Sequence, residues 1–157
     1  PYYYNQNTMA RFPRDGARFC TKYIDAPINA QFPFGYGLSY SEFEYSNLKL
    51  SSDEYSGADD IKVSVDVKNI SEIDGEETVQ VYVHDKVASM IRPVKELKAF
   101  EKVFIKSGET KTVELTIPVS SLGFYNIDMK YVVEPGDFDI YVGCNADSGL
   151  KTELRVV

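Results

Sequence analysis

The feature that most constrains the fold is a strict alternation of apolar and polar residues in short segments. Residues 61–67 read Ile-Lys-Val-Ser-Val-Asp-Val, and the same two-residue period returns at residues 79–83, 113–117 and 138–142. Successive side chains of a β-strand point to opposite faces, so each segment predicts a strand with one apolar face. The chain is therefore expected to consist of half-buried strands.

Further strands complete this pattern. Segments 43–50 (with a break in register), 97–105, 129–133 and 154–156 are also predicted strands, and Val119–Leu122 is the one helical candidate, at most a turn. Seven or eight short strands can bury their apolar faces only against one another, in two packed sheets. This predicts an all-β protein, an immunoglobulin-like or fibronectin type III-like sandwich. Its predicted core includes Val63, Val65, Val67, Val79, Val81, Val83, Leu115, Ile117, Phe138, Ile140 and Val142.

The first forty residues lack this period. Residues 1–40 contain four prolines between scattered aromatics and show neither a helical nor a strand repeat. A structureless segment of that length is unusual inside a compact domain, so its contacts are expected to lie elsewhere. We therefore predict an extended arm or interdomain linker over residues 1–40 and a sandwich over residues 41–157. The opening Pro-Tyr-Tyr-Tyr, without an initiator Met, is what we expect of a chain cut from a longer protein.

The arm ends in an aromatic, glycine-rich stretch, Gln-Phe-Pro-Phe-Gly-Tyr-Gly at residues 31–37. Two interpretations compete: a surface that stacks on a flat ligand such as a sugar, or an anchor pressed against a neighbouring domain. The chain has no Trp, Phe has no hydroxyl for hydrogen bonds to a sugar, and glycine lets the backbone lie close to another surface. These points favour the anchor. Its docking side chains are predicted to be Phe32, Phe34, Tyr36, Leu38 and Tyr40.

Charge and hydropathy argue against two classes of partner. The formal net charge of −7 argues against nucleic acid and against an anionic membrane surface. No apolar run has the length of a transmembrane helix, so no membrane insertion is predicted. The basic residues Arg92, Lys95 and Lys98 either bridge to acidic groups of a neighbouring domain or form a solvated patch, and both interpretations stay open.

The only histidine does not predict a catalytic site. His84 precedes Asp85, but adjacent residues of a strand face opposite sides, and Ser89 would have to return from a separate loop to complete a triad. We interpret His84 as part of a polar rim at the end of a strand. No nucleotide-binding or hydrolase fingerprint is present either. This chain on its own is predicted not to be an enzyme, and no catalytic residue is assigned.

Neither a metal nor a cofactor is predicted. The acidic runs at residues 59–60, 72–77 and 137–139 do not have the spacing of a calcium-binding loop, and we interpret them as solvated. Cys20 and Cys144 have no second cysteine and no histidine nearby in the sequence, so a zinc site is not expected. They are interpreted as unlinked, mostly buried thiols.

Three motifs, in order along the chain, carry a family resemblance. "FPFGYGLSYSEFEYSNLKL" is followed by "ASMIRPVKELKAFEKVFIKSGETKTVELTIP" and then by "NIDMKYVVEPGDFDIYVGCNAD". The first motif resembles the segment that enters the C-terminal sandwich of glycoside hydrolase family 3, which is the β-glucosidase family. The second resembles that family's Arg-Pro-x-Lys-x-Leu-Lys-x-Phe-x-Lys pattern. The third resembles its closing Pro-Gly-x-Phe-x-Ile-x-Val-Gly hairpin. The likeness covers residues 31 to about 147, and Ala99 departs from the glycine that is commoner in the family.

The resemblance implies a non-catalytic accessory domain. Family members are retaining enzymes with a carboxylate nucleophile and a carboxylic acid/base, which the resemblance places in domains upstream of this chain. It implies that the sandwich packs against and stabilises the catalytic domains of the same parent chain, with Arg92 as a further docking residue, in a periplasmic or secreted protein. In an isolated chain, the aromatic side chains that normally dock on the catalytic domains would be exposed, and self-association could cover them. The alternatives are a free-standing carbohydrate-binding module and a cell-surface adhesion domain.

Removal of residues 1–30 is expected to leave the sandwich folded, because every predicted core strand lies downstream. The thermal midpoint should shift only slightly when the truncated and complete chains are compared by calorimetry. Loss of cooperative unfolding in the truncated chain would place the arm in the core and contradict the predicted boundary.

Overall fold

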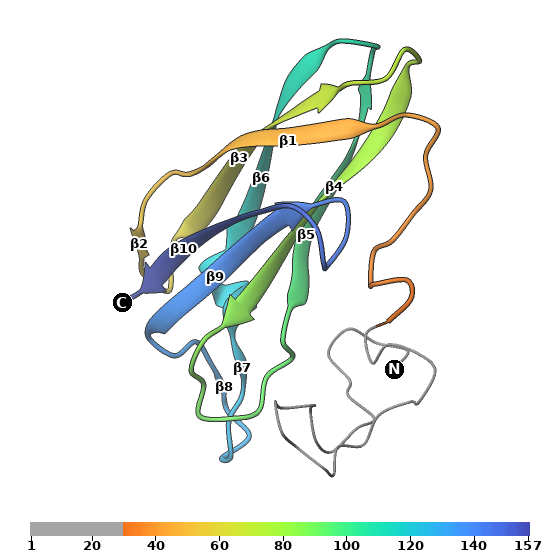
Figure 1. The fold of residues 1–157 in the computed structure, drawn as a ribbon. Helices are drawn as coiled ribbons and strands as arrows, with labels where there is room; N and C mark the ends of the chain where they lie inside the picture. Colours follow the sequence, from red (N-terminus) through yellow and green to blue (C-terminus); the bar gives the residue numbers. More distant parts are fainter. Residues whose placement is uncertain (1–29) are drawn as a thin grey trace, which may run out of the picture.

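Two β-sheets that face each other across one apolar core form the body of the protein (Figure 1). The computed structural model describes residues 30–157. The three-stranded sheet has the order β1-β3-β6, with bounds Phe43–Leu50, Asp60–Asn69 and Thr110–Pro118. The five-stranded sheet has the order β2-β10-β9-β4-β5, with bounds Glu54–Tyr55, Leu150–Val156, Gly136–Gly143, Gly75–Asp85 and Glu96–Ile105. The 3-10 turn η1 and the hairpin β7-β8 connect β6 to β9, with bounds Val119–Leu122, Phe124–Tyr125 and Tyr131–Val132.

The predicted all-β sandwich is confirmed, and so is the direction in which the strands face. Val63 and Val65 of β3 are completely buried, and they pair with Leu115 and Val113 of β6. Every residue of the predicted core is buried, with at most 5% of its surface exposed. A slip of one residue in a strand would have turned all of its apolar side chains to the solvent, so the alternation alone determines the inward face.

The predicted break in the first strand is a one-residue shift in the pairing of β1 with β3. The shift lies between Ser46 and Lys49. Within it, Asn47 has a φ of 53°, a left-handed conformation that Asn tolerates better than most residues. Its side-chain amide donates to the carboxylate of Asp66 over 2.8 Å. The shift allows both Tyr45, before it, and Leu48, within it, to pack against the core.

Some elements were not predicted from the sequence. Strands β2 and β7 have two residues each, and β8 covers only two residues of the predicted segment 129–133. Strand β2 is the only one of these that extends a main sheet, where it pairs in parallel with β10. Two-residue strands carry too little alternation to be recognised in a sequence. The turn at Val119–Leu122 was predicted correctly.

A buried asparagine at the end of β3 joins the β3–β4 loop to the β5–β6 turn at one end of the sandwich. The side-chain nitrogen of Asn69 donates to the carbonyls of Ile73 (2.8 Å) and Ile105 (3.0 Å). Its side-chain oxygen accepts from the backbone N–H of Ser71 at 3.0 Å. Its backbone N–H donates to the carbonyl of Glu109, and its carbonyl accepts from Gly108. All these polar groups are therefore satisfied, which is what permits Asn69 to be completely buried.

One carboxylate of the acidic run 72–77 is buried, contrary to the prediction that the run is solvated. Glu77 lies on the inward side of β4 and is only 8% exposed. Its carboxylate accepts a hydrogen bond of 2.6 Å from the hydroxyl of Tyr45, which lies on β1 of the other sheet. Burial raises the pKa of Glu77, although this hydrogen bond acts in the opposite direction. Burial, and then the bond to Glu77, also raise the pKa of Tyr45.

The raised pKa of Glu77 predicts a loss of stability as the pH rises. Below the ordinary pKa near 4.5, the folded and unfolded states both hold the proton, and the contribution of this group is fully present. The contribution is lost as the pH rises through the folded-state pKa, because the unfolded state has then already released its proton. In the Glu77→Gln variant, the free energy of unfolding, measured by urea titration, should fall less over this pH range than in the unmodified chain. Glu76→Gln is the control, since the side chain of Glu76 is 53% exposed. Equal pH profiles for Glu77→Gln and the unmodified chain would contradict the prediction.

Candidate docking site

The candidate site is the segment that leads into the first strand. Residues 30–42 form neither a strand nor a helix, and Figure 1 shows them as the orange trace beside the sandwich. A turn at the start of this segment is closed by the N–H of Tyr36, which donates to the carbonyl of Pro33 over 3.0 Å. We call residues 32–40 the docking segment, because they carry the five predicted docking side chains.

Two side chains on the outer face of β4 hold the backbone of this segment. The amide nitrogen of Gln80 donates to the carbonyls of Gly35 (3.1 Å) and Cys144 (2.6 Å). The hydroxyl of Tyr82 donates to the carbonyl of Phe34 (3.2 Å), which also accepts from the N–H of Ala146 (2.9 Å). Gln80 and Tyr82, which we call the β4 anchor pair, are buried. The docking segment is therefore attached to both β4 and the β9–β10 loop.

Gly35 is required where the segment crosses the β4 anchor pair. Its φ is +80°, a conformation that other residues adopt only under strain. A Cβ atom at this position would also overlap the side chains of Gln80 and Tyr82. Gly37 differs on both counts, because its φ is outside this region and no atom lies within 4 Å of the place of its Cβ. The close approach foreseen for the glycines thus occurs at Gly35 alone.

The predicted docking side chains are all exposed, although the ring of Phe34 also contacts the β4 anchor pair. Their exposed fractions are 61% for Phe32, 44% for Phe34, 44% for Tyr36, 90% for Leu38 and 96% for Tyr40. The rings of Phe32 and Tyr36 lie 5.1 Å apart, and that of Phe34 meets Tyr82 edge to face at 6.4 Å. An open groove of about 640 Å³ lies beside them, and residues 37–41 form one of its walls. Contiguous exposed apolar side chains of this kind are typical of an interaction surface.

The three basic residues of the sequence analysis lie elsewhere, and they are bonded within the sandwich. The guanidinium of Arg92 is 2.7 Å from the carboxylate of Glu96 and 4.7 Å from the centre of the Phe124 ring. Lys98 bridges to Glu96 (2.8 Å), and its ammonium also donates to the carbonyl of Ser121. The side chains of Arg92 and Lys98 are only 14% exposed. They are therefore not the solvated patch that one of the two interpretations described.

Lys95 is also held internally. Its ammonium lies 4.1 Å from the centre of the Tyr141 ring and donates to the carbonyl of Ala146. Burial lowers the pKa of Lys95. The role of Arg92 in docking stays a prediction. Its guanidinium already forms a salt bridge with Glu96 inside the sandwich.

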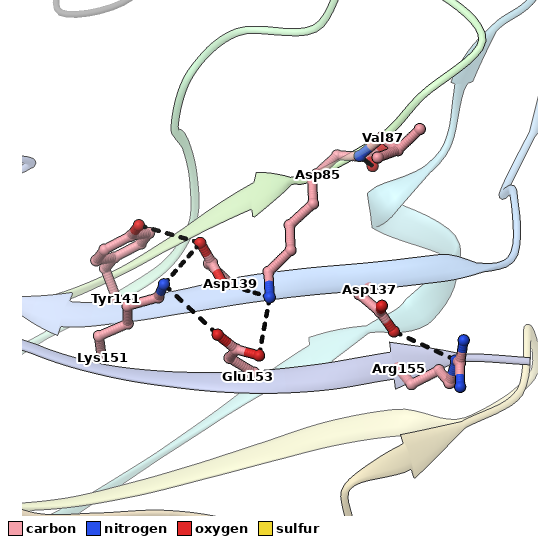
Figure 2. A network of polar contacts seen from close by, with 9 residues as sticks. Asp85, Val87, Asp137, Asp139, Tyr141, Lys151, Glu153 and Arg155 are labelled. Atoms are coloured by element: carbon pink, nitrogen blue, oxygen red, sulfur yellow. Dashed lines mark hydrogen bonds and ion pairs between the residues drawn. The ribbon is translucent and has the colours of Figure 1, made fainter.

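A charged network covers the outer face of β9 and β10 (Figure 2). Asp139, in the acidic run predicted to be solvated, is instead 5% exposed, because Lys86 (3.2 Å) and Lys151 (2.9 Å) bracket its carboxylate. Burial opposes ionisation of Asp139, but the bonds from these two lysines outweigh it, and the pKa of Asp139 lies below its usual range. Glu153 bridges to the same lysines. The network therefore pairs each carboxylate with a cation and presents no unpaired acid to a substrate.

The residues examined for catalysis do not come together. The hydroxyl and the N–H of Ser89 both donate to the carboxylate of Glu134, so Ser89 does not reach His84. His84 pairs across the sheet with Asp139, whose carboxylate is taken up by the lysines. Within residues 30–157, no cluster of three His, Cys, Asp or Glu side chains has the arrangement of a metal site, and no helix is long and apolar enough to cross a membrane. Cys144 is half-buried beside Ser148, whereas Cys20 lies outside the described residues.

This topology, with two sheets and a preceding segment attached along one of them, defines a fibronectin type III-like sandwich. Residues 77–146 match the family model described as "Fibronectin type III-like domain". The match begins at Glu77 and includes both members of the β4 anchor pair as well as Cys144 and Ala146. The chain thus contains a domain of this class.

Relatives and solved structures narrow the class to one family. The chain is 40% identical to the "Periplasmic beta-glucosidase" of Salmonella typhimurium over 92% of its own length, and 45% identical to the "Thermostable beta-glucosidase B" of Acetivibrio thermocellus over 86%. It superposes on the β-glucosidase of Listeria innocua in complex with gluconolactone with a TM-score of 0.86 and 42% identity, covering 98% of this chain and 22% of that one. The chain belongs to the fibronectin type III-like domains of glycoside hydrolase family 3. It spans about a fifth of the length of the curated relatives, 19% and 18% respectively.

Residues 32–40 stand out in the sequence, but the side chains that hold them were missed. Gln80 and Tyr82 occupy the nominally polar positions of a strand that reads Val-Gln-Val-Tyr-Val. Their size could have revealed them. Two large side chains at successive outward positions of a strand indicate a covered face rather than a solvated one. Their acceptors, the carbonyls of Phe34 and Gly35, are backbone groups and leave no trace in the sequence.

Gly35→Ala is expected to destabilise the protein by about 1–3 kcal/mol, because the new methyl group meets the β4 anchor pair and the positive φ is strained. Urea unfolding measures the loss, and limited proteolysis within residues 30–40 should become faster as the segment detaches. Gly37→Ala is the matched control, and it should change the free energy of unfolding by less than about 0.5 kcal/mol. Equal effects of the two variants would show that the attachment at Gly35 is unimportant.

Proposed function

We propose that this chain is a non-catalytic accessory domain of a family 3 glycoside hydrolase and that it packs against the catalytic domains of the same longer protein. The observation that carries the proposal is the docking segment. Its backbone is fixed by the β4 anchor pair while Leu38 and Tyr40 stay almost completely exposed. A side chain held in place but not covered is suited to insertion into a neighbouring surface, and burial of apolar area supplies the stabilisation.

The longer protein is proposed to be a retaining hydrolase of β-linked glucosides or related sugars, located in the periplasm or secreted. The names of the relatives support this, among them the periplasmic enzyme of Salmonella typhimurium. Its two catalytic carboxylates are proposed to lie outside the described residues. In support, the buried acids Glu77 and Asp139 of the sandwich are bonded to Tyr45 and to two lysines. The purified 157-residue chain should give no turnover of an aryl β-glucoside, and turnover above background would refute a purely accessory role.

Docking by the segment predicts a difference between the isolated chain and the longer protein. Leu38→Asp should lower the thermal midpoint of the longer protein by several degrees, because it places a charge in the proposed contact. The same substitution should leave the isolated chain unchanged, since Leu38 is 90% exposed there. Ile70→Asp is the control, at an exposed position on the β3–β4 loop, and should have little effect in either protein.

Calorimetric titration with oligosaccharides separates this proposal from a carbohydrate-binding module. Phe32 and Phe34 offer no hydroxyl to a sugar, and the chain contains no Trp, so no saturable binding to the isolated chain is expected. Specific saturable binding that Tyr36→Ala or Tyr40→Ala abolishes would instead favour the module. An adhesion domain would be recognised by binding of the isolated chain to cell surfaces.

A further inference from the structure

A second group of apolar side chains is exposed at one end of the sandwich. Figure 1 shows the β4–β5 loop and the β7–β8 hairpin together at the lower end of the molecule. Eight large, uncharged side chains of these two segments are between 40% and 102% exposed. We call them the tip surface: Val87, Met90, Ile91, Val94, Tyr125, Ile127, Met129 and Tyr131. Tyr and Met are enriched in protein interfaces, where charged residues are depleted.

Two polar side chains of the β4–β5 loop, Ser89 and Arg92, are bonded to other parts of the chain. Ser89 donates twice to the carboxylate of Glu134, which follows β8. Arg92 donates to the carbonyl of Leu122, and its guanidinium lies over the ring of Phe124. An ordinary solvated loop presents such groups to water and keeps its apolar side chains inside. In this loop the apolar side chains are exposed as well, and Ile91 is fully exposed.

The β7–β8 hairpin is equally well fixed. The side-chain oxygen of Asn126 accepts from the N–H groups of Asp128 and Lys130, both at 3.0 Å. The rings of Tyr125 and Tyr131 meet edge to face at 5.3 Å. The hairpin therefore holds its apolar side chains in place without burying them, which lowers the entropic cost of binding a partner.

The tip surface and the docking segment belong to one connected structure. Ala146 is completely buried in the β9–β10 loop, and its N–H donates to the carbonyl of Phe34 in the docking segment. Its own carbonyl accepts from the ammonium of Lys95, at the end of the β4–β5 loop. One residue thus links the segment that enters the sandwich to the loop that forms half of the tip surface.

The direction of the docking segment indicates what covers the tip surface. The hydroxyl of Ser41 lies at the start of β4, 3.3 Å from the carbonyls of Ile73 and Asp74. Seven residues earlier, Phe34 lies beside Tyr82, far along the same strand. Followed backwards, the chain therefore advances along β4 toward Asp85, where the tip loop begins. The docking segment thus meets β4 near its tip end, at Tyr82, and leaves it at the opposite end, where Ser41 lies.

We propose that the tip surface docks on the same upstream domain of the longer protein that the docking segment contacts. This inference rests on the proposed function, and it adds a second contact that braces the sandwich at its end. The partner is a folded protein face that is mainly apolar, with polar groups to meet Asp128 and Lys130, which are exposed between the apolar side chains of the hairpin. Four-fifths of the length of the relatives lies outside this chain and is the source of such a face.

Hydrogen exchange of the unmodified proteins tests the inference without any substitution. The backbone amides of residues 86–94 and 125–131 should exchange about tenfold more slowly in the longer protein than in the 157-residue chain. The β5–β6 turn at residues 106–109, at the other end of the sandwich, is the control and should exchange alike in both. Slow exchange at the tip already in the 157-residue chain would overturn the inference, because the cover would then be residues 1–29 or a second copy.

Substitutions separate this inference from the proposed function. Ile91→Asp and Ile127→Asp should lower the thermal midpoint of the longer protein by several degrees and leave the 157-residue chain unchanged, since both side chains are exposed there. If Leu38→Asp destabilises the longer protein but the two tip variants do not, the docking segment acts alone and the inference is wrong. If none of the three has an effect, the proposed function fails as well. Conversion of a dimer to a monomer by Ile91→Asp in the 157-residue chain would identify a second copy as the partner and also overturn it.

Discussion

The apolar core to which the inner faces of β3 and β4 both contribute is the feature on which the rest of the structure depends. Their valines belong to one core cluster that includes residues from both main sheets. Strand β4 is buried on both faces, because its outer face is also buried at Gln80 and Tyr82. In antiparallel sandwiches the outer face ordinarily meets water. Strand β4 has no solvated face over its central residues, because the docking segment and the β9–β10 loop lie on it.

The sequence predicts those parts of the fold that repeat. The alternation in residues 61–67 and 138–142 determines both the strands and their inward side chains, because a period of two leaves no other choice of face. The break in the first strand was also visible in the spacing of Tyr45 and Leu48. The docking segment was recognisable from composition, since aromatics between glycines stand out against the strands that follow.

The parts that escaped prediction are polar contacts between residues far apart in the sequence. Asn69 bonds to Ile105, and Asp139 is bracketed by Lys86 and Lys151, so neither burial follows from its neighbours in the chain. Compositional reasoning places such groups in water, because an unpaired buried charge is costly. They are buried here because the fold supplies partners from other strands. The same reason explains why neither interpretation of Arg92 included its internal contacts with Glu96 and Phe124.

The attachment at Gly35 also determines what can be exchanged between proteins. A sandwich cut at the first residue of β1 would lose the carbonyls of Phe34 and Gly35, which the β4 anchor pair uses as acceptors. A gene fusion or recombination event that cuts the chain at the start of β1 would thus transfer an incomplete domain, in which the ring of Tyr82 is uncovered. The unit that can be transferred intact is the sandwich together with the residues from Pro33 onward. Residues 33–40, which read as part of a linker in the sequence, are in this sense the first structural element of the domain.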